Sequence, residues 1–367
     1  MTRMQRLVVL AALAATLFVA APAAEAATPR APKGFYGVMW DRAAMDGSSV
    51  DEGAQWALMR RSGVESVRLV FSWARAQPEP GVQPDFSDTD AKVELAARNG
   101  IRLLPVVLNT PGWAEKYPGR HGSPPEFASD FAAFMSRLVE RYGPAGSFWA
   151  ERPDLPRRPL REWQIWNEPH FDFYWYSPDG GWAAEYVELL RAAKRAIKSA
   201  DPGARVVLAG FADASWKVLA KAYRAGARGA FDVATINLFT GRPGFVMAAV
   251  RLTRRVLRRY HQPRKPIWVT ETTFPAAKGL VPPPDEDWKR RWYTTKRGMA
   301  SRLAELYRLG AENARRLRLG RIYWYTWASS YRGQDDLFDY SGLLRVAEDG
   351  ASTAQPALRA FRRATRR

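Results

Sequence analysis

The sequence predicts an α/β fold: one domain in which eight parallel strands alternate with helices and close into a (β/α)8 TIM barrel. Three observations predict it: eight short apolar segments, helical periodicity between them, and a chain length that suits one barrel. The 367 residues are 47% hydrophobic and 13% aromatic, which is enough to bury one large core. Barrel folds often reach this length without dividing into several domains, so we expect one barrel domain over residues 27–367.

Each expected strand is a short run rich in Val, Ile, Leu and aromatic residues. The eight runs are residues 35–40, 66–73, 101–108, 162–168, 204–210, 231–239, 266–272 and 321–327. Apolar runs of this length are typical of strands buried on both faces, as in a parallel sheet.

The segments between these runs carry apolar residues at helical spacing. The clearest are residues 50–63, 88–100, 127–143, 181–203 and 216–226. Several end in glycine just before the next strand, as helix C-termini favour. An open doubly wound sheet is the competing fold, but no glycine-rich phosphate loop follows the first strand. The alternation therefore favours the barrel.

Residues 1–26 are expected to be a signal peptide. A basic start with Arg3 and Arg6 precedes an apolar run from Leu7 to Ala21, and small residues follow it. An uncleaved membrane anchor is the alternative, although the run is short for a spanning helix. We therefore expect export, to the outside of the cell or to the periplasm and cell envelope. The absence of cysteine is compatible with an oxidising compartment.

The chain is strongly basic, with a formal net charge of +19. Such a charge favours acidic polysaccharide, an anionic envelope surface or nucleic acid as a neighbour. Basic clusters lie at residues 251–260 and 314–321, and the simpler explanation is that they form solvated helix faces. No nucleic-acid-binding module is recognisable, so nucleic acid is not an expected partner.

Two carboxylates fall near strand ends. Glu168 lies in the segment QIWNEPH (164–170), at the end of the fourth run, and Glu271 lies near the end of the seventh. The carboxyl ends of barrel strands form the active-site mouth. Glycosidic cleavage requires two carboxylic groups across a pocket, with their pKa values pushed apart. For either residue alone, a structural ion pair is an equally good explanation, but the two together favour catalysis.

Metal chemistry is the rival use of such carboxylates. The three histidines, His121, His170 and His261, form no close ligand motif with a carboxylate. We therefore expect no metal and no organic cofactor.

The pairing of Asn167-Glu168-Pro169 on the fourth strand with Thr270-Glu271 on the seventh resembles retaining glycoside hydrolases of the large (β/α)8 clan that includes families 5 and 39. The resemblance extends from about residue 35 to residue 361. It implies that Glu168 is the general acid/base and Glu271 the nucleophile. It also implies that Asn167 hydrogen-bonds the sugar 2-hydroxyl, a contact that strengthens in the transition state.

Other strand ends extend the resemblance. Arg68 matches a second-strand arginine of the clan that lies near the nucleophile and would keep it ionised. Trp327, in preference to Trp324, matches an eighth-strand tryptophan that forms a platform under the sugar. After the sixth strand the clan often has a His and, two residues later, a Tyr that bonds the nucleophile; this chain has Asn237 and Phe239 instead. Asn237 keeps a hydrogen-bond donor, whereas Phe239 does not.

Fifteen tryptophans are many for this length. Trp40 and Trp73, like Trp113 and Trp175, fall at or just beyond strand ends, where their rings could stack on sugars. Core filling is the alternative for each of them. The aromatic segment 170–182 after Glu168 could wall a cleft or cover the barrel.

Together these features predict an exported retaining glycosidase (EC 3.2.1.-) that cleaves a poly- or oligosaccharide by double displacement. The basic charge favours an acidic exopolysaccharide as substrate. Two alternatives stay open: a carbohydrate-binding pseudoenzyme, which the missing tyrosine favours, and a transglycosylase that remodels an envelope glycan. Sugar identity, linkage, endo or exo action and oligomeric state are not predicted.

Overall fold

The computed structural model describes residues 31–41, 49–333 and 336–366. The predicted signal peptide, residues 1–26, lies outside the described residues. Within the described part of the chain, no helix is both long and apolar enough to cross a membrane.

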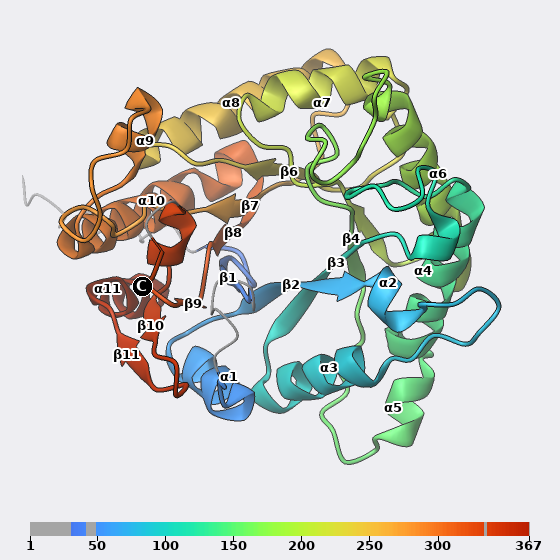
Figure 1. Cartoon of the computed structure of the whole chain (residues 1–367), viewed down its shortest axis with the longest axis horizontal. Helices are drawn as coiled ribbons and strands as arrows, with labels where there is room; N and C mark the ends of the chain where they lie inside the picture. Colours follow the sequence, from blue (N-terminus) through green and yellow to red (C-terminus); the bar gives the residue numbers. More distant parts are fainter. Residues whose placement is uncertain (1–30, 42–48, 334–335, 367) are drawn as a thin grey trace, which may run out of the picture.

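Eight parallel strands form the central sheet, as predicted, and Figure 1 shows them surrounded by helices. They are β1 Tyr36–Met39, β2 Ser66–Ser72, β3 Arg102–Leu108, β4 Glu162–Ile165, β5 Arg205–Val207, β6 Ala234–Asn237, β7 Ile267–Thr272 and β8 Leu319–Trp324. Their order in the sheet is β5-β4-β3-β2-β1-β8-β7-β6. An isolated parallel bridge between Val207 and Val233 joins β5 to the start of the β6 segment and closes the barrel.

Helices cover the outside of the barrel. They are α1 Glu52–Arg61, α2 Trp73–Ala76, α3 Ser87–Asn99, α4 Ala128–Tyr142, α5 Ser147–Glu151, α6 Trp182–Ala200, α7 Ser215–Arg224, α8 Pro243–Arg259, α9 Asp287–Trp292, α10 Lys296–Leu317 and α11 Pro356–Thr365. Local sequence fixes several ends: the Asp51 side chain accepts a hydrogen bond from the Ala54 N–H at the start of α1. Gly100 ends α3 with φ 68°, a left-handed conformation that glycine adopts without strain.

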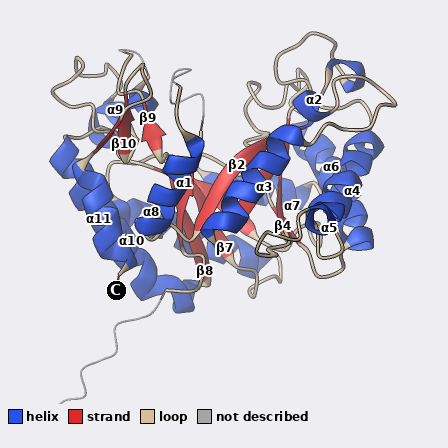
Figure 2. Cartoon of the chain, turned by 90° about the horizontal axis from the view of Figure 1, so that it is seen from below, coloured by secondary structure: helices blue, strands red, loops and turns tan. Residues whose placement is uncertain are grey.

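A second, three-stranded sheet follows β8. It contains β9 Ala328–Ser329, β10 Leu344–Val346 and β11 Ser352–Ala354. Figure 2 shows β9, β10 and α9 at the same end of the molecule as α2, which follows the carboxyl end of β2. This end is the mouth of the barrel.

Four strands, β4, β5, β6 and β8, end two or three residues before their apolar runs do. β4 stops at Ile165 because Trp166 and Glu168 adopt left-handed backbone conformations, with φ of 66° and 42°. Only Asn167 returns to the sheet, through a parallel bridge to Gly210. β8 ends at Trp324, three residues before Trp327.

Candidate active site

Glu168 is presented by the irregular backbone after β4. Its N–H donates to the carbonyl of Gly210 at 2.9 Å, which fixes this turn against the end of β5. Non-glycine residues with positive φ are uncommon, and they persist where the surrounding structure holds them in place. The local strain at Trp166 and Glu168 therefore coincides with the residue predicted to be the general acid/base.

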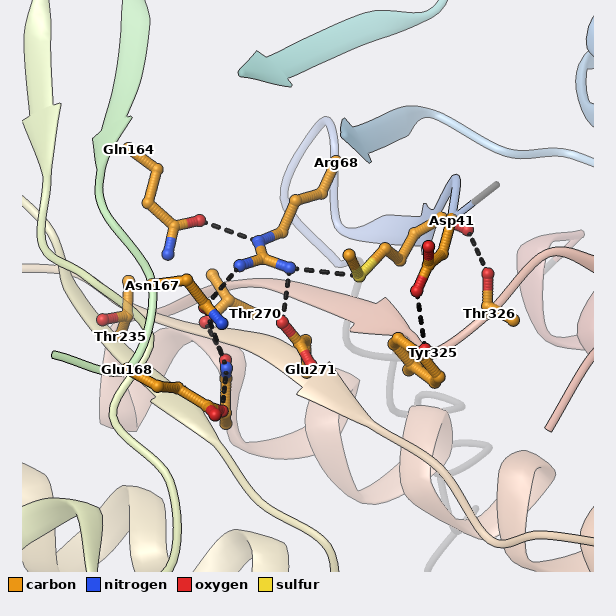
Figure 3. Close-up of polar contacts among 12 residues, drawn as sticks. Asp41, Arg68, Gln164, Asn167, Glu168, Thr235, Thr270, Glu271, Tyr325 and Thr326 are labelled. Carbon is orange, nitrogen blue, oxygen red and sulfur yellow. Dashed lines mark hydrogen bonds and ion pairs between the residues drawn. The ribbon is translucent and has the colours of Figure 1, made fainter. Parts of the chain in front are cut away.

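Arg68, on β2, holds one side of the site together (Figure 3). Its Nη1 donates to Glu271 Oε1 at 2.6 Å, Nη2 to Asn167 Oδ1 at 2.9 Å, and Nε to Gln164 Oε1 at 2.8 Å. The guanidinium is buried, so these contacts replace its lost hydration. One arginine thus fixes the orientation of both the predicted nucleophile and the predicted sugar-binding amide.

Asn237, at the end of β6, holds the other side. Its Nδ2 donates to Glu168 Oε1 at 2.7 Å, and its Oδ1 accepts from the Thr270 hydroxyl at 2.7 Å. In the ladder between β6 and β7 it pairs with Glu271. The amide therefore lies against both carboxylates, and the hydroxyl of Thr270 sets which of its ends faces Glu168.

Burial and neighbouring charges give the two carboxylates different pKa values. Loss of hydration, and then the charge of Glu271, raise the pKa of Glu168 to about 8, while the Asn237 hydrogen bond opposes the shift. Burial also raises the pKa of Glu271, but here the direct ion pair with Arg68 opposes it. Glu271 is therefore the group that ionises first, and Glu168 is the group that keeps a proton near neutral pH.

Both carboxylates are buried yet retain a little exposure, 8% for Glu168 and 7% for Glu271. Among the described residues, no group of three or more His, Cys, Asp or Glu side chains is placed to hold a metal ion. The arrangement is therefore able to donate a proton from one carboxylic acid and present a second carboxylate as a nucleophile.

Two tyrosines near the carboxylates were missed at the sequence level. Tyr325, just after β8, donates to Asp41 Oδ2 at 2.6 Å. Burial, and then the charges of Glu271 and Glu168, raise the pKa of Tyr174, so this phenol lies within the electrostatic influence of the two carboxylates. Tyr174 lies in the aromatic segment 170–182 that follows Glu168. For Tyr325, its position at the end of an expected strand was the available signal.

The tryptophans predicted to contact a sugar are buried. Trp73 is fully buried and packs on Phe134, and Trp327 is fully buried with its Nε1 donating to Gln55 Oε1 at 2.9 Å. Both rings lie in the core, and their sugar contacts stay predictions. Trp40 is also buried, against Trp56, and its sugar contact stays a prediction. The catalytic roles of Glu168, Glu271, Asn167 and Arg68 likewise stay predictions.

Gly210 provides the space that Asn237 occupies. A Cβ at position 210 would lie 2.6 Å from Asn237 Cγ, closer than real Cβ contacts allow. We expect Gly210→Ala to displace the amide from Glu168 and to lower kcat/KM by about 10²-fold, because small misplacements in an active site have costs of this order. Steady-state kinetics on an aryl glycoside would measure this change.

Gly244→Ala is the matched control, since a Cβ there meets nothing within 4 Å. Equal activity of the two alanine variants would contradict the positioning role of Gly210. A thermal melt of each variant separates a loss of activity from a loss of folding.

Comparison with solved structures shows the same architecture. A family 39 glycoside hydrolase from Bacteroides cellulosilyticus WH2 superposes with a TM-score of 0.64 at 18% identity, covering 91% of this chain and 64% of that one. The GH39 enzyme from Xanthomonas axonopodis pv. citri gives 0.65 at 18% identity, covering 92% and 67%. The GH53 catalytic domain from Ignisphaera aggregans gives 0.59 at 21% identity, covering 91% and 97%.

The chain shares the (β/α)8 fold of these glycoside hydrolases. This confirms the single-barrel fold expected from the sequence resemblance. The chain spans about two thirds of the length of the two family 39 structures. No protein-family model and no curated protein matches the sequence.

Proposed function

We propose that the protein is a retaining glycoside hydrolase that cleaves O-glycosidic bonds of a poly- or oligosaccharide by double displacement. The observation that carries the proposal is the division of acidity between two adjacent buried carboxylates: Glu271 is ion-paired with Arg68, whereas Glu168 is desolvated and holds its proton. The solved barrels of similar fold are described as glycoside hydrolases, which supports the same chemistry here.

In the first step, a Glu271 oxygen attacks the anomeric carbon while the bond from that carbon to the leaving oxygen breaks. Glu168 gives its proton to the leaving oxygen. Asn167, fixed by Arg68, accepts or donates a hydrogen bond at the sugar 2-hydroxyl. The product of this step is a glycosyl ester of Glu271.

In the second step, the ionised Glu168 takes a proton from a water molecule, and the water oxygen attacks the anomeric carbon. The ester bond to Glu271 breaks and the carboxylate is restored. Esterification of Glu271 in the first step removes its negative charge and so lowers the pKa of Glu168, because that charge helps to raise it in the free enzyme. The same residue can therefore act first as acid and then as base.

The proposal includes export of the chain through residues 1–26 and an acidic exopolysaccharide as substrate. Export is supported by the signal-like composition of that segment, and the substrate by the net charge of +19. A single carboxylate pair also serves transfer to a sugar acceptor, so transglycosylation is the second candidate activity.

Mass spectrometry of the intact protein after incubation with activated 2-deoxy-2-fluoro glycosides tests the proposal. We expect a mass increase of one glycosyl unit in the wild type and none in Glu271→Gln, because the fluorine slows the second step and traps the ester. The exposed Glu79→Gln is the matched control and should label like the wild type.

Labelling that persists in Glu271→Gln would contradict the assignment of the nucleophile. A folded protein that binds glycans but is labelled by no donor would be a carbohydrate-binding pseudoenzyme. Release of the label to added sugars in preference to water would identify a transglycosylase.

A further inference from the structure

A basic hollow of about 700 Å³ lies beside the catalytic centre. Five of its lining residues are cationic and one, Asp287, is acidic; the cations are Arg242, Lys278, Arg290, Arg291 and Arg302. They come from the segments after β6 and β7 and from α10, and Figure 1 shows α8 and α9 in the sector of the barrel outside these two strands. We call this site the cationic hollow.

The positive charge of the cationic hollow is largely uncompensated. Asp287 lies 3.9 Å from Arg290, and within the described part of the chain no ion pair involves Arg242, Lys278 or Arg291. These three side chains are exposed. Arg302 is partly buried and donates to the Trp292 carbonyl at 2.9 Å. Burial and the nearby charge of Arg242 lower the pKa of Arg302, so the two cations lie close enough to repel each other. An anion between them would relieve this repulsion.

Exposed aromatic rings accompany the cations. Trp288 is 52% exposed and Phe245 is 58% exposed, and both line the cationic hollow. The Trp288 ring stacks on the buried Trp292, with centroids 5.8 Å apart and planes inclined by 22°, so it is held in place from beneath. A fixed, exposed indole beside guanidinium groups suits a pyranose ring that carries an anionic substituent.

The cationic hollow adjoins the catalytic residues. Phe239 lines it and follows Asn237 by two residues, and the Leu238 N–H between them donates to the Glu271 carbonyl at 2.9 Å. The Phe239 ring packs against Trp292 and Phe338, and its centroid lies 6.4 Å from that of Tyr325, which donates to Asp41. The aromatic cluster around Phe239 therefore separates the carboxylates from the cationic hollow, and a glycan that extends past this cluster would reach the cations.

We infer that the cationic hollow is a glycan subsite that binds an anionic sugar unit, a uronate or a sulfated sugar, of a chain that extends from the catalytic pair. The inference rests on the proposed function for the position of that chain, but the binding itself does not depend on turnover. Guanidinium groups recognise carboxylate and sulfate oxygens in the same paired geometry, so both sources of negative charge are tested.

Titration calorimetry in a Glu168→Gln background tests the inference with three probes: hexagalacturonate, a sulfated heparin hexasaccharide and neutral cellohexaose. The double change Arg242→Gln/Arg291→Gln should weaken binding of at least one anionic probe by about tenfold, the loss expected for charge-assisted hydrogen bonds. Binding of cellohexaose should stay within twofold. The anionic probe that is affected identifies the substituent.

The matched control is Arg157→Gln/Arg158→Gln, which removes the same charge from a second arginine-lined hollow of about 460 Å³. That hollow also contains Arg102 and Arg205, the first residues of β3 and β5, and so lies at the opposite end of the barrel. The control pair should change binding of the anionic probes less than twofold.

Equal losses in the two double variants would show an effect of net charge alone and would overturn the inference, as would unchanged binding in both. This result is separate from the fluoroglycoside labelling. If the protein is labelled but binding of the anionic probes does not depend on Arg242 and Arg291, the hydrolase proposal stands and the subsite is ruled out. If binding of the anionic probes depends on these arginines but no donor labels the protein, the cationic hollow is a binding site for anionic glycans on a protein that does not cleave them.

Discussion

Glu168→Gln is expected to lower kcat/KM about 10³-fold on glycosides with poor leaving groups, because the variant has no proton to give to the leaving oxygen. The loss should be small for a dinitrophenyl glycoside, whose leaving group needs no protonation. The amide oxygen of the introduced glutamine can still accept the hydrogen bond from Asn237, so the site geometry is kept. Initial rates on a series of aryl glycosides measure this dependence.

The pH dependence of the same variant gives a second measurement. In the wild type, kcat/KM should fall as pH rises through about 8, where Glu168 loses its proton, and it should fall at low pH as Glu271 becomes protonated. Glu168→Gln should lose the alkaline limb with the dinitrophenyl substrate and keep the acidic one. A variant that retained the alkaline limb would assign that limb to another group.

The raised pKa of Glu168 should also make the stability of the fold depend on pH. The folded pKa of Glu168 is raised above its unfolded value, so the wild type binds more protons when folded and loses stability as pH rises from about 4.5 to about 8. Glu168→Gln lacks this loss, and its Tm relative to the wild type should rise over that range. The exposed Glu79→Gln should show no such trend.

Arg68→Met should abolish most activity and destabilise the fold. It leaves Glu271 buried without its cation, and breaking one side of a buried ion pair costs about 3–5 kcal/mol. Without Arg68 the pKa of Glu271 rises further, so the acidic limb of kcat/KM should move to higher pH and the rate at neutral pH should fall about 10²–10³-fold. Chemical denaturation and pH–rate profiles measure the two effects.

Arg254→Met is the matched control for Arg68→Met. Arg254 is also buried, but it donates to the carbonyls of Pro263, Lys265 and Leu317 and, among the residues that the structure describes, to no carboxylate. It should cost stability without moving the acidic limb. The double variant Arg68→Met/Glu271→Gln should regain stability relative to Arg68→Met while staying inactive. An acidic limb that moves equally in Arg68→Met and Arg254→Met would contradict the role of Arg68.

The fold could be predicted because its signals are local and repeated. Each of the eight expected apolar runs overlaps a strand, and the helical periodicity between them corresponds to helices. The ends were less predictable: composition extends the fourth run to Glu168, whereas left-handed conformations at Trp166 and Glu168 end β4 at Ile165. Backbone strain of this kind depends on tertiary contacts, here with Gly210, that no local pattern encodes.

The site was only partly predictable for a related reason. The sequence predicted Arg68 within the second strand and Asn167, Glu168, Asn237 and Glu271 near strand ends, and the structure places the five in one hydrogen-bonded group. For aromatic residues, position along a strand does not decide between core and mouth, because both are apolar environments. Trp73 and Trp327 were predicted to contact a sugar and are buried, whereas Tyr325 was signalled only by its position at the end of an expected strand.

The closure of the barrel has a consequence for how substrate binding could be observed. β5 and β6 meet through an isolated bridge, with the Asn237 N–H donating to the Phe211 carbonyl as a further link, and not through a continuous ladder. Glu168 lies on the β5 side of this seam and Glu271 on the β6 side, so any local opening changes the separation of the two carboxylates. A glycan that contacts both sides would oppose local opening of the barrel between β5 and β6. Its binding should therefore slow amide hydrogen exchange at Leu208 and Asn237 even when no bond is cleaved.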